Sequence, residues 1–278
     1  MSQATIARPV EVSGIGLHSG EPTTVRLEPM LGNGRTMGRT DGVVFSAHVH
    51  AVRDYARATR LGVDDWDGAD VSTVEHLLAA LAAFEIDHVF VGVEGGEVPV
   101  LDGSAKPFVD LLRRAGREVS GTDRALHAPV VLEEAVEVRD GDRFVRAEPS
   151  AHFGFRYEID FAHPTIGRQS IEVDRLTPER FAEEIAPART FGFLQDLEAL
   201  RREGLSAGAN LENTLVFDEA GVVNDAPLRF PDECVRHKAI DLIGDLALLD
   251  APLQAFVTAY KAGHRLHHAL VREIEARR

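Results

Sequence analysis

Three polar side chains recur at intervals of four residues in a segment that is otherwise typical of a buried helix. His237, Asp241 and Asp245 lie in the stretch RHKAIDLIGDL (residues 236–246), among apolar neighbours. That spacing places all three on one stripe of a helix. An imidazole and a carboxylate at positions i and i+4 can bind one cation together, as the two histidines of an HExxH helix do. Spacing alone favours a hydrogen-bonded His–Asp pair. The apolar surroundings strengthen the case for a metal, because burying both groups without partners is costly.

A catalytic zinc needs a third protein ligand and an open position for water. The best candidates are Glu75 and His76, which begin a helix expected over residues 72–85 (STVEHLLAALAAFE). The competing interpretation is structural. Ser72 and Glu75 have the spacing of a capping box, in which the carboxylate caps the start of the helix. The local pattern alone somewhat favours the capping box.

His264 is a candidate general acid. It follows a strand expected over residues 253–260 and lies in the loop KAGH, where its imidazole could pair with a carboxylate such as Asp245. A histidine in this position is, by itself, more typical of a helix start or of the surface. Lys238 and Lys261 lie close to these histidines in sequence and could bind phosphate there, although either lysine is by default a solvated charge.

Other histidines and glycines indicate structure rather than chemistry. We expect His267 and His268 at solvated positions of a helix, and His48 and His50 alternate on an expected strand. The turn GIGLHSG (residues 14–20) lacks the spacing and the strand–helix context of a dinucleotide or phosphate loop, so as a nucleotide signal it is weak.

The order of elements repeats along the chain. Strands, helix, strand, loop and helix occur twice, which predicts an α+β fold with two domains of similar topology. The helices are expected over residues 72–85, 107–116, 230–249 and 265–276. The polar stretch 116–129 is the expected linker, and we place the domains at residues 1–122 and 123–278. Residues 188–217 have no counterpart in the first half, and inserted elements of that kind often line a site.

Composition restricts the class of function. The chain has 278 residues and a single cysteine, Cys234, so a metal would be held by histidine and carboxylate. A formal net charge of −15 argues against a nucleic-acid partner. The apolar run LLAALAAF (residues 77–84) is too short to span a bilayer, and the N-terminus has no secretory signal. We expect a soluble cytoplasmic monomer that acts on a small molecule.

Six segments occur in a characteristic order: GIGLHSG, STVEHLLAAL, EVPVLDGSAKPF, ARTFGF, RHKAIDLIGDL and YKAGH. Together they closely resemble the signature segments of the UDP-3-O-acyl-N-acetylglucosamine deacetylases, the zinc amidases of lipid A biosynthesis. The resemblance covers nearly the whole chain. It implies two α+β domains with the active site in the cleft between them, and it makes the metal interpretation the stronger one.

The resemblance also implies a role for each candidate residue. The Zn²⁺ ligands would be His76, His237 and Asp241, and Fe²⁺ could use the same set. The catalytic residues would be Glu75 as general base, His264 as the imidazole that works with it, Asp245 as the carboxylate that orients His264, Thr190 at the carbonyl oxygen, and Lys238 near the diphosphate. The substrate-binding residues would be Lys261 and Arg143 for phosphate, Phe161 and Phe191 for the uracil and sugar, Asp196 for sugar hydroxyls, and Leu205 and Leu211 for the acyl chain.

Three departures from the family pattern bear on specificity. Ala209 and Asn210 replace the usual glycine and serine, Arg60 replaces a small residue, and RLHH follows YKAGH in place of ALNN. We expect deacetylase activity with an altered acyl preference. One alternative is a zinc amidase for another N-acetylated sugar. The other is a sugar-nucleotide-binding scaffold without catalysis, which would have no need of a base, an acid and three ligands.

Overall fold

Two mixed β-sheets enclose the main helices of this computed structural model, which describes residues 3–39, 42–54, 57–63, 70–119 and 128–278. The first sheet has the strand order β2 (Val10–Ile15), β3 (Pro22–Pro29), β8 (Val89–Glu94), β4 (Arg35–Arg39), β5 (Val44–Ser46). The second has the order β11 (Val136–Asp140), β12 (Arg143–Pro149), β17 (Leu253–Tyr260), β13 (Gly154–Asp160), β14 (Arg168–Val173), and β10 (Val130–Val131) pairs with β17. The α+β class expected from the sequence is confirmed.

The two sheets have the same topology. Each central strand, β8 or β17, is antiparallel to the neighbour on one side and parallel to the neighbour on the other. Each is preceded by one long helix and followed by another, so the repeated order of elements corresponds to a repeated sheet. The boundary that we placed at residues 122 and 123 lies outside the described residues. Part of the expected linker is a strand, since β9 (Arg117–Val119) pairs with β1 (Ala4–Ile6).

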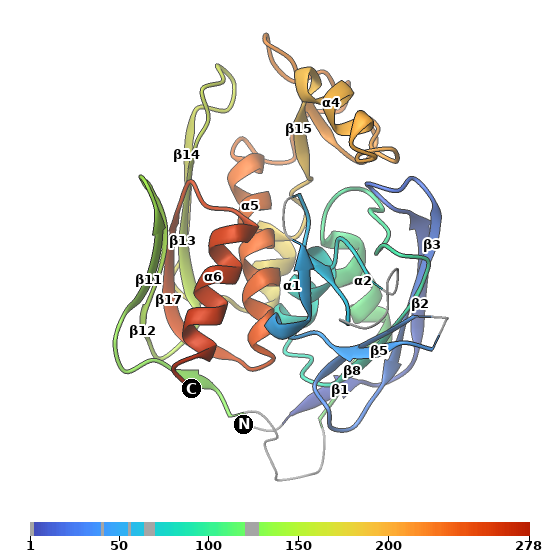
Figure 1. Cartoon of the computed structure of the whole chain (residues 1–278), viewed down its shortest axis with the longest axis vertical. Helices are drawn as coiled ribbons and strands as arrows, with labels where there is room; N and C mark the ends of the chain where they lie inside the picture. Colours follow the sequence, from blue (N-terminus) through green and yellow to red (C-terminus); the bar gives the residue numbers. More distant parts are fainter. Residues whose placement is uncertain (1–2, 40–41, 55–56, 64–69, 120–127) are drawn as a thin grey trace.

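The main helices lie between the two sheets in Figure 1. They are α1 (Glu75–Ala83), α2 (Lys106–Ala115), α5 (Glu233–Leu246) and α6 (His264–Glu275). Helix α1 packs against α5, α5 packs against β13 and β14, and α6 packs against α5, β11 and β12. Residues of β17 are buried and half-buried in turn, as expected of a strand that packs against helices on one face only. Helix α2 begins at Lys106, has Pro107 in its first turn and ends before Gly116, which has a φ of +70°.

Shorter elements connect these layers. They are the pair β6 (Val52–Asp54) and β7 (Arg60–Leu61), the parallel pair β15 (Phe191–Phe193) and β16 (Leu215–Phe217), the short helices α3 (Pro178–Arg180) and α4 (Leu197–Arg202), the 3₁₀ turns η1 (Val49–Ala51), η3 (Leu194–Asp196) and η4 (Ala247–Leu249), and the π turn η2 (Phe181–Ile185). The segment that carries β15 and α4 projects beyond both sheets at the top of Figure 1. His48 and His50 lie around η1 and not on the expected strand, because His48 Nδ1 caps this turn by accepting from the His50 amide.

No helix within the described ranges combines the length and the apolarity needed to cross a membrane.

Candidate metal centre and active-site pocket

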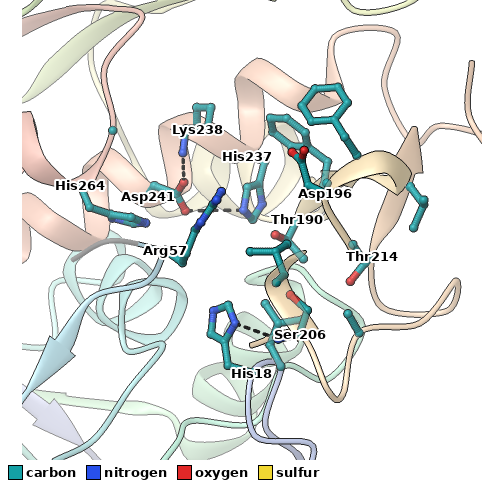
Figure 2. A pocket seen from close by; sticks show the side chains of 18 of the residues that line it. His18, Arg57, Thr190, Asp196, Ser206, Thr214, His237, Lys238, Asp241 and His264 are labelled. Atoms are coloured by element: carbon teal, nitrogen blue, oxygen red, sulfur yellow. Dashed lines mark hydrogen bonds and ion pairs between the residues drawn. The ribbon is translucent and has the colours of Figure 1, made fainter. Parts of the chain in front are cut away.

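A pocket of about 1150 Å³ is lined by residues of both sheet-and-helix units and of the inserted segment 188–217. The residues that reach it include Glu75 and His76 at the start of α1, His237, Lys238 and Asp241 on α5, and His264 at the start of α6. Figure 2 shows Asp241 between Lys238 and His237, with His18 and Ser206 on the opposite side. The pocket therefore collects side chains that lie far apart in the sequence.

Close packing of α1 on α5 places the candidate metal ligands together. A Cβ atom at Gly244 would lie 2.1 Å from the carbonyl oxygen of Glu75, so only glycine allows α5 to approach the first turn of α1 this closely. As a result, Asp241 Oδ1 lies 3.7 Å from His76 Nε2 and 3.5 Å from His237 Nε2. All three side chains are buried.

The donor set fits a single metal ion. Ligand atoms at the usual zinc distances in a tetrahedral arrangement lie roughly 3.3 Å apart, close to the separations seen here. Hydrogen bonds orient the donors. His237 Nδ1 donates to the Ala188 carbonyl at 3.2 Å, which leaves Nε2 as the lone-pair nitrogen, and Lys238 Nζ donates to Asp241 Oδ2 at 2.6 Å. His76, His237 and Asp241 thus present three converging donors.

The charge states also suit ligation. Burial lowers the pKa of His237 to about 3, so its imidazole is neutral, as a metal ligand must be. Burial works against ionisation of Asp241, but the positive charges of Lys238 and of protonated His264 outweigh it and hold the pKa of this carboxyl well below its usual range. Lys238 is therefore the ion-pair partner of Asp241, rather than a side chain directed only at substrate phosphate.

Glu75 faces the pocket and does not cap its helix. The N-cap of α1 is Val74 and makes no side-chain cap, so the capping-box interpretation was wrong. Thr73 takes a φ of +59°, which breaks the geometry that a capping box from Ser72 needs. Glu75 Oε2 accepts the Thr59 amide at 3.1 Å, and Oε1 lies 3.8 Å from His264 Nε2. Burial raises the pKa of Glu75.

His264 is paired with Asp245, as the sequence suggested. His264 Nδ1 donates to Asp245 Oδ2 at 2.7 Å. Although burial lowers the pKa of His264, the negative charges of Asp245, Asp241 and Glu75 raise it to about 9. The imidazole is therefore protonated at neutral pH.

The expectation that His267 and His268 are solvated was wrong. Both side chains are completely buried, and both donate to Asp245, at 2.8 and 2.9 Å. Positions 264, 267 and 268 lie on one face of α6, and that face packs on α5 rather than facing solvent.

Most of the other predicted residues line the pocket. These are Thr190, Phe161, Phe191, Asp196, Lys261, Arg143 and Leu211. The Phe161 and Phe191 rings are edge-to-face with centroids 5.6 Å apart. Lys261 Nζ is held by Asp160 at 3.0 Å and by Asp142 at 3.2 Å. Leu205, in the turn after α4, is not among the residues that line the pocket.

Of the residues that depart from the family pattern, Arg60 lies elsewhere than we expected, whereas Ala209 and Asn210 both line the pocket. Arg60 does not line the pocket, because its guanidinium pairs with Asp70 at 2.8 Å on the exposed side of β7. Arg57, three residues earlier, does line it. Asn210 lines the pocket, but its side-chain oxygen is used within its own turn, where Oδ1 accepts the Glu212 amide at 2.8 Å. Ala209 lines the pocket as expected.

Sequence reasoning missed His18 as a pocket residue. Its loop is built around Glu97, which accepts the amides of His18 and Ser19 at 2.9 Å and the Thr73 hydroxyl at 2.8 Å. A Cβ at Gly16 would lie 2.2 Å from Glu97 Oε2. The sequence feature that could have indicated His18 is the glycine-rich turn 14–20. Its glycines leave room for the Glu97 carboxylate, not for a nucleotide phosphate.

Comparison with known proteins agrees with this site. The family model described as LpxC, UDP-3-O-acyl N-acetylglycosamine deacetylase, matches residues 3–276. Curated proteins named UDP-3-O-acyl-N-acetylglucosamine deacetylase are similar over almost their whole length. The one from Myxococcus xanthus is 44% identical over 98% of this chain and 86% of the relative. The one from Thermosynechococcus vestitus is 45% identical over 100% of this chain and 95% of the relative.

Proposed function

The chain belongs to the family of UDP-3-O-acyl-N-acetylglucosamine deacetylases, and from this premise we propose that it hydrolyses the acetamide of such a sugar nucleotide. The products are acetate and the UDP-3-O-acyl-glucosamine amine, and the reaction is a step of lipid A biosynthesis. The observation that carries the proposal is the meeting, in one pocket, of a three-donor metal set, a buried carboxylate and a protonated imidazole.

We propose Zn²⁺ as the metal, held by His76, His237 and Asp241, with Fe²⁺ as the alternative for the same donors. When bound, the ion supplies a Lewis acid that polarises a carbonyl and lowers the pKa of a coordinated water to about 7. Lys238 keeps Asp241 ionised and occupies its second oxygen, so that Oδ1 stays available.

The chain's own residues supply the proton transfers. Glu75 is the general base that takes the proton of the attacking water. His264 carries a proton at neutral pH and donates it to the departing amine, while Asp245 holds its ring. The hydroxyl of Thr190 donates to the carbonyl oxygen as negative charge develops there. A neutral amide is a poor electrophile, so all of these contributions are needed.

The rest of the pocket is proposed to bind the rest of the substrate. Lys261 and Arg143 attract the diphosphate, and Phe161 and Phe191 offer flat surfaces to uracil and sugar, with Asp196 binding sugar hydroxyls. The acyl chain lies along the apolar side chains of the inserted segment, which include Leu194, Leu197, Leu200 and Leu211.

We further propose that residues 1–122 and 123–278 are two domains with the site in the cleft between them. We propose a monomer as the working unit, since one chain supplies the candidate metal set and the groups that would transfer protons. The cytoplasm, where UDP-sugars are made and used, is the proposed location.

Acetate release tests the proposal. The zinc-loaded protein is incubated with UDP-3-O-acyl-N-acetylglucosamine, and the Asp241→Ala variant serves as the blank. We expect acetate from the native protein only, with metal bound in stoichiometric amount by the native protein alone. Equal turnover of unacylated UDP-N-acetylglucosamine would instead assign the chain to another N-acetylated sugar. No release by a folded, metal-loaded protein would refute the proposed function.

A further inference from the structure

Asp245 is the centre of a buried hydrogen-bond network that contains further donors besides His264. Its carboxylate is completely buried. Oδ2 accepts from His264 Nδ1 at 2.7 Å and from His267 Nδ1 at 2.8 Å. Oδ1 accepts from His268 Nε2 at 2.9 Å and from the Thr59 hydroxyl at 2.5 Å. Four donors therefore surround one carboxylate, and three of them are imidazoles of one face of α6.

The geometry assigns a proton to each nitrogen that faces Asp245. An ionised carboxylate only accepts hydrogen bonds, so each imidazole must donate through the facing nitrogen. His267 Nε2, on the other side of its ring, lies 3.2 Å from the Tyr157 hydroxyl. Burial raises the pKa of Tyr157 well above its usual value and lowers the pKa of His267. Tyr157 therefore keeps its proton and donates it, and His267 is a neutral ring protonated at Nδ1 only.

We propose that His267 and His268 are positioning residues for His264. They fill the acceptor positions of Asp245 that His264 and Thr59 leave, so that the carboxylate stays fixed and holds the His264 ring with Nε2 toward Glu75. The inference rests on the proposed function, in which His264 donates its proton to the departing amine. Hydrophobic side chains could have filled this core at no electrostatic cost, whereas three histidines there serve the charge of Asp245.

A second consequence concerns acid strength. The titratable groups that face His264 are Glu75 from α1, Asp241 and Asp245 from α5, the two neighbouring imidazoles of α6, and His18 from the loop after β2. The neutral His267 ring donates to Asp245, spreads the negative charge of the carboxylate and weakens its hold on the His264 proton. Without this hydrogen bond, His264 becomes a weaker acid. The network thus keeps the proton bound at neutral pH and still transferable.

The experiment compares two replacements of His267. The amide nitrogen of asparagine occupies about the place of Nδ1, so His267→Asn keeps the donor to Asp245, whereas His267→Leu removes it. For His267→Leu we expect the basic limb of the kcat/KM profile to move up by about half to one pH unit. We also expect kcat to fall while KM is unchanged. His267→Asn should stay close to the native protein in all three quantities. Equal behaviour of the two variants, or an unmoved limb in His267→Leu, would overturn the proposal.

A spectroscopic readout separates this inference from the proposed function. In metal-loaded protein labelled with ¹⁵N-histidine, we expect the His267 ring to show the neutral Nδ1–H tautomer and the His264 ring to carry protons on both nitrogens at pH 7. If these protonation states are observed but the protein has no deacetylase activity, the proposed function is refuted and the proposed hydrogen-bond network is not. An Nε2–H tautomer at His267 would refute the inference at any level of activity.

The Tyr157→Phe variant covers the case in which His267→Leu does not fold. It removes only the hydroxyl that fixes the outer nitrogen of His267. We expect the Nδ1–H tautomer to lose population and the basic limb to move in the same direction by a smaller amount. An unchanged tautomer together with an unchanged limb would count against the proposal.

Discussion

The Lys238 ammonium lies 2.6 Å from Asp241 Oδ2 and is largely buried, so its first effect is on the metal centre. Groups that orient a ligand typically change metal affinity by about 10–100-fold when they are removed. We therefore expect Lys238→Met to weaken zinc binding by about that factor, measured by competition with a chelator. Lys106→Met, which breaks only the surface pair with Asp110, is the control and should bind zinc normally. A raised KM for the UDP-sugar with unchanged zinc affinity would show that Lys238 serves the phosphates instead.

The raised pKa of His264 predicts the basic limb of the pH profile. Burial disfavours its charged form, but Asp245, Asp241 and Glu75 raise its pKa to about 9. A proton donor is active below its pKa, so kcat/KM should be level up to about pH 9 and fall tenfold per unit above it. His264→Gln should abolish this limb and lower the rate by about 10²–10⁴-fold. His152→Gln, at an exposed histidine outside this pocket, should keep both the limb and the rate.

The same group links pH to stability. The folded-state pKa of His264 lies above its unfolded value of 6.5, so its contribution is fully present below pH 6.5. The contribution is lost as pH rises through about 9. Metal-loaded protein should therefore unfold at lower urea concentration at pH 9.5 than at pH 6.5, and His264→Gln should reduce that difference. An equal pH dependence in the variant would mean that other groups cause the loss.

At the scale of elements, the approach of α1 to α5 determines whether the donors converge. A Cβ at Gly244 would lie 2.1 Å from the Glu75 carbonyl oxygen and 2.9 Å from its Cα, so Gly244→Ala must push the two helices apart. Overpacking of this kind typically costs about 1–3 kcal/mol. We expect that loss in urea unfolding together with weaker zinc binding, since Asp241 and His76 lie on the separated helices. Gly221→Ala, where the nearest atom lies at 3.4 Å, should leave both quantities unchanged.

The elements were largely predictable from the sequence because their apolar residues recur at the helix or strand period. Strand β17 has the expected bounds, and α2 and α6 begin within one residue of them. The candidate ligands were also predictable, since His237 and Asp241 share one helix and the segment STVEH opens another. Periodicity cannot tell which partner a polar helix face will meet. His267 and His268 were therefore misassigned to solvent, although the face of α6 that carries them packs on Asp245.

Backbone geometry accounts for the other differences. The capping box at Ser72 and Glu75 was a sound local pattern, but the positive φ of Thr73 cannot be inferred from residue types. Arg60 and Arg57 both precede or begin β7, and only the course of the chain decides that Arg60 pairs with Asp70 while Arg57 lines the pocket. The two arginines are three positions apart, and tertiary packing determines which of their side chains points into the pocket.

At the scale of the whole molecule, the two sheets have equivalent strand orders, and the helices that precede their central strands are α1 and α5. These two helices pack against each other at the junction of the two units. The candidate metal set takes His76 from one unit and His237 and Asp241 from the other. A bound ion would therefore cross-link the repeated units, in addition to any part in catalysis.

A second contact joins the units without metal. Arg35 of β4 is buried, and its guanidinium donates to the carbonyls of Ile86 and Ala247, at 2.9 and 3.3 Å. Its amide donates to Asp250 Oδ1 at 3.2 Å. Burial lowers the pKa of Arg35, while the charge of Asp250 opposes that effect. Removal of the metal should therefore loosen the junction without unfolding the protein.

Metal removal then has a predictable thermal effect. A ligand that binds only the folded state stabilises it by about 2.7 kcal/mol at a concentration 100 times its Kd, which raises the Tm of a chain of this size by about 5 °C. We expect the chelator-treated protein to unfold in one transition at a Tm lower by about that amount, and added Zn²⁺ to restore it. Asp241→Ala should lose the zinc-dependent part of the Tm, whereas Asp232→Asn, which breaks only the ion pair with Arg236 on the same helix, should keep it. A Tm independent of zinc in the native protein would mean that the ion does not bridge the two units, because a cross-link between them cannot be removed without cost to the folded state.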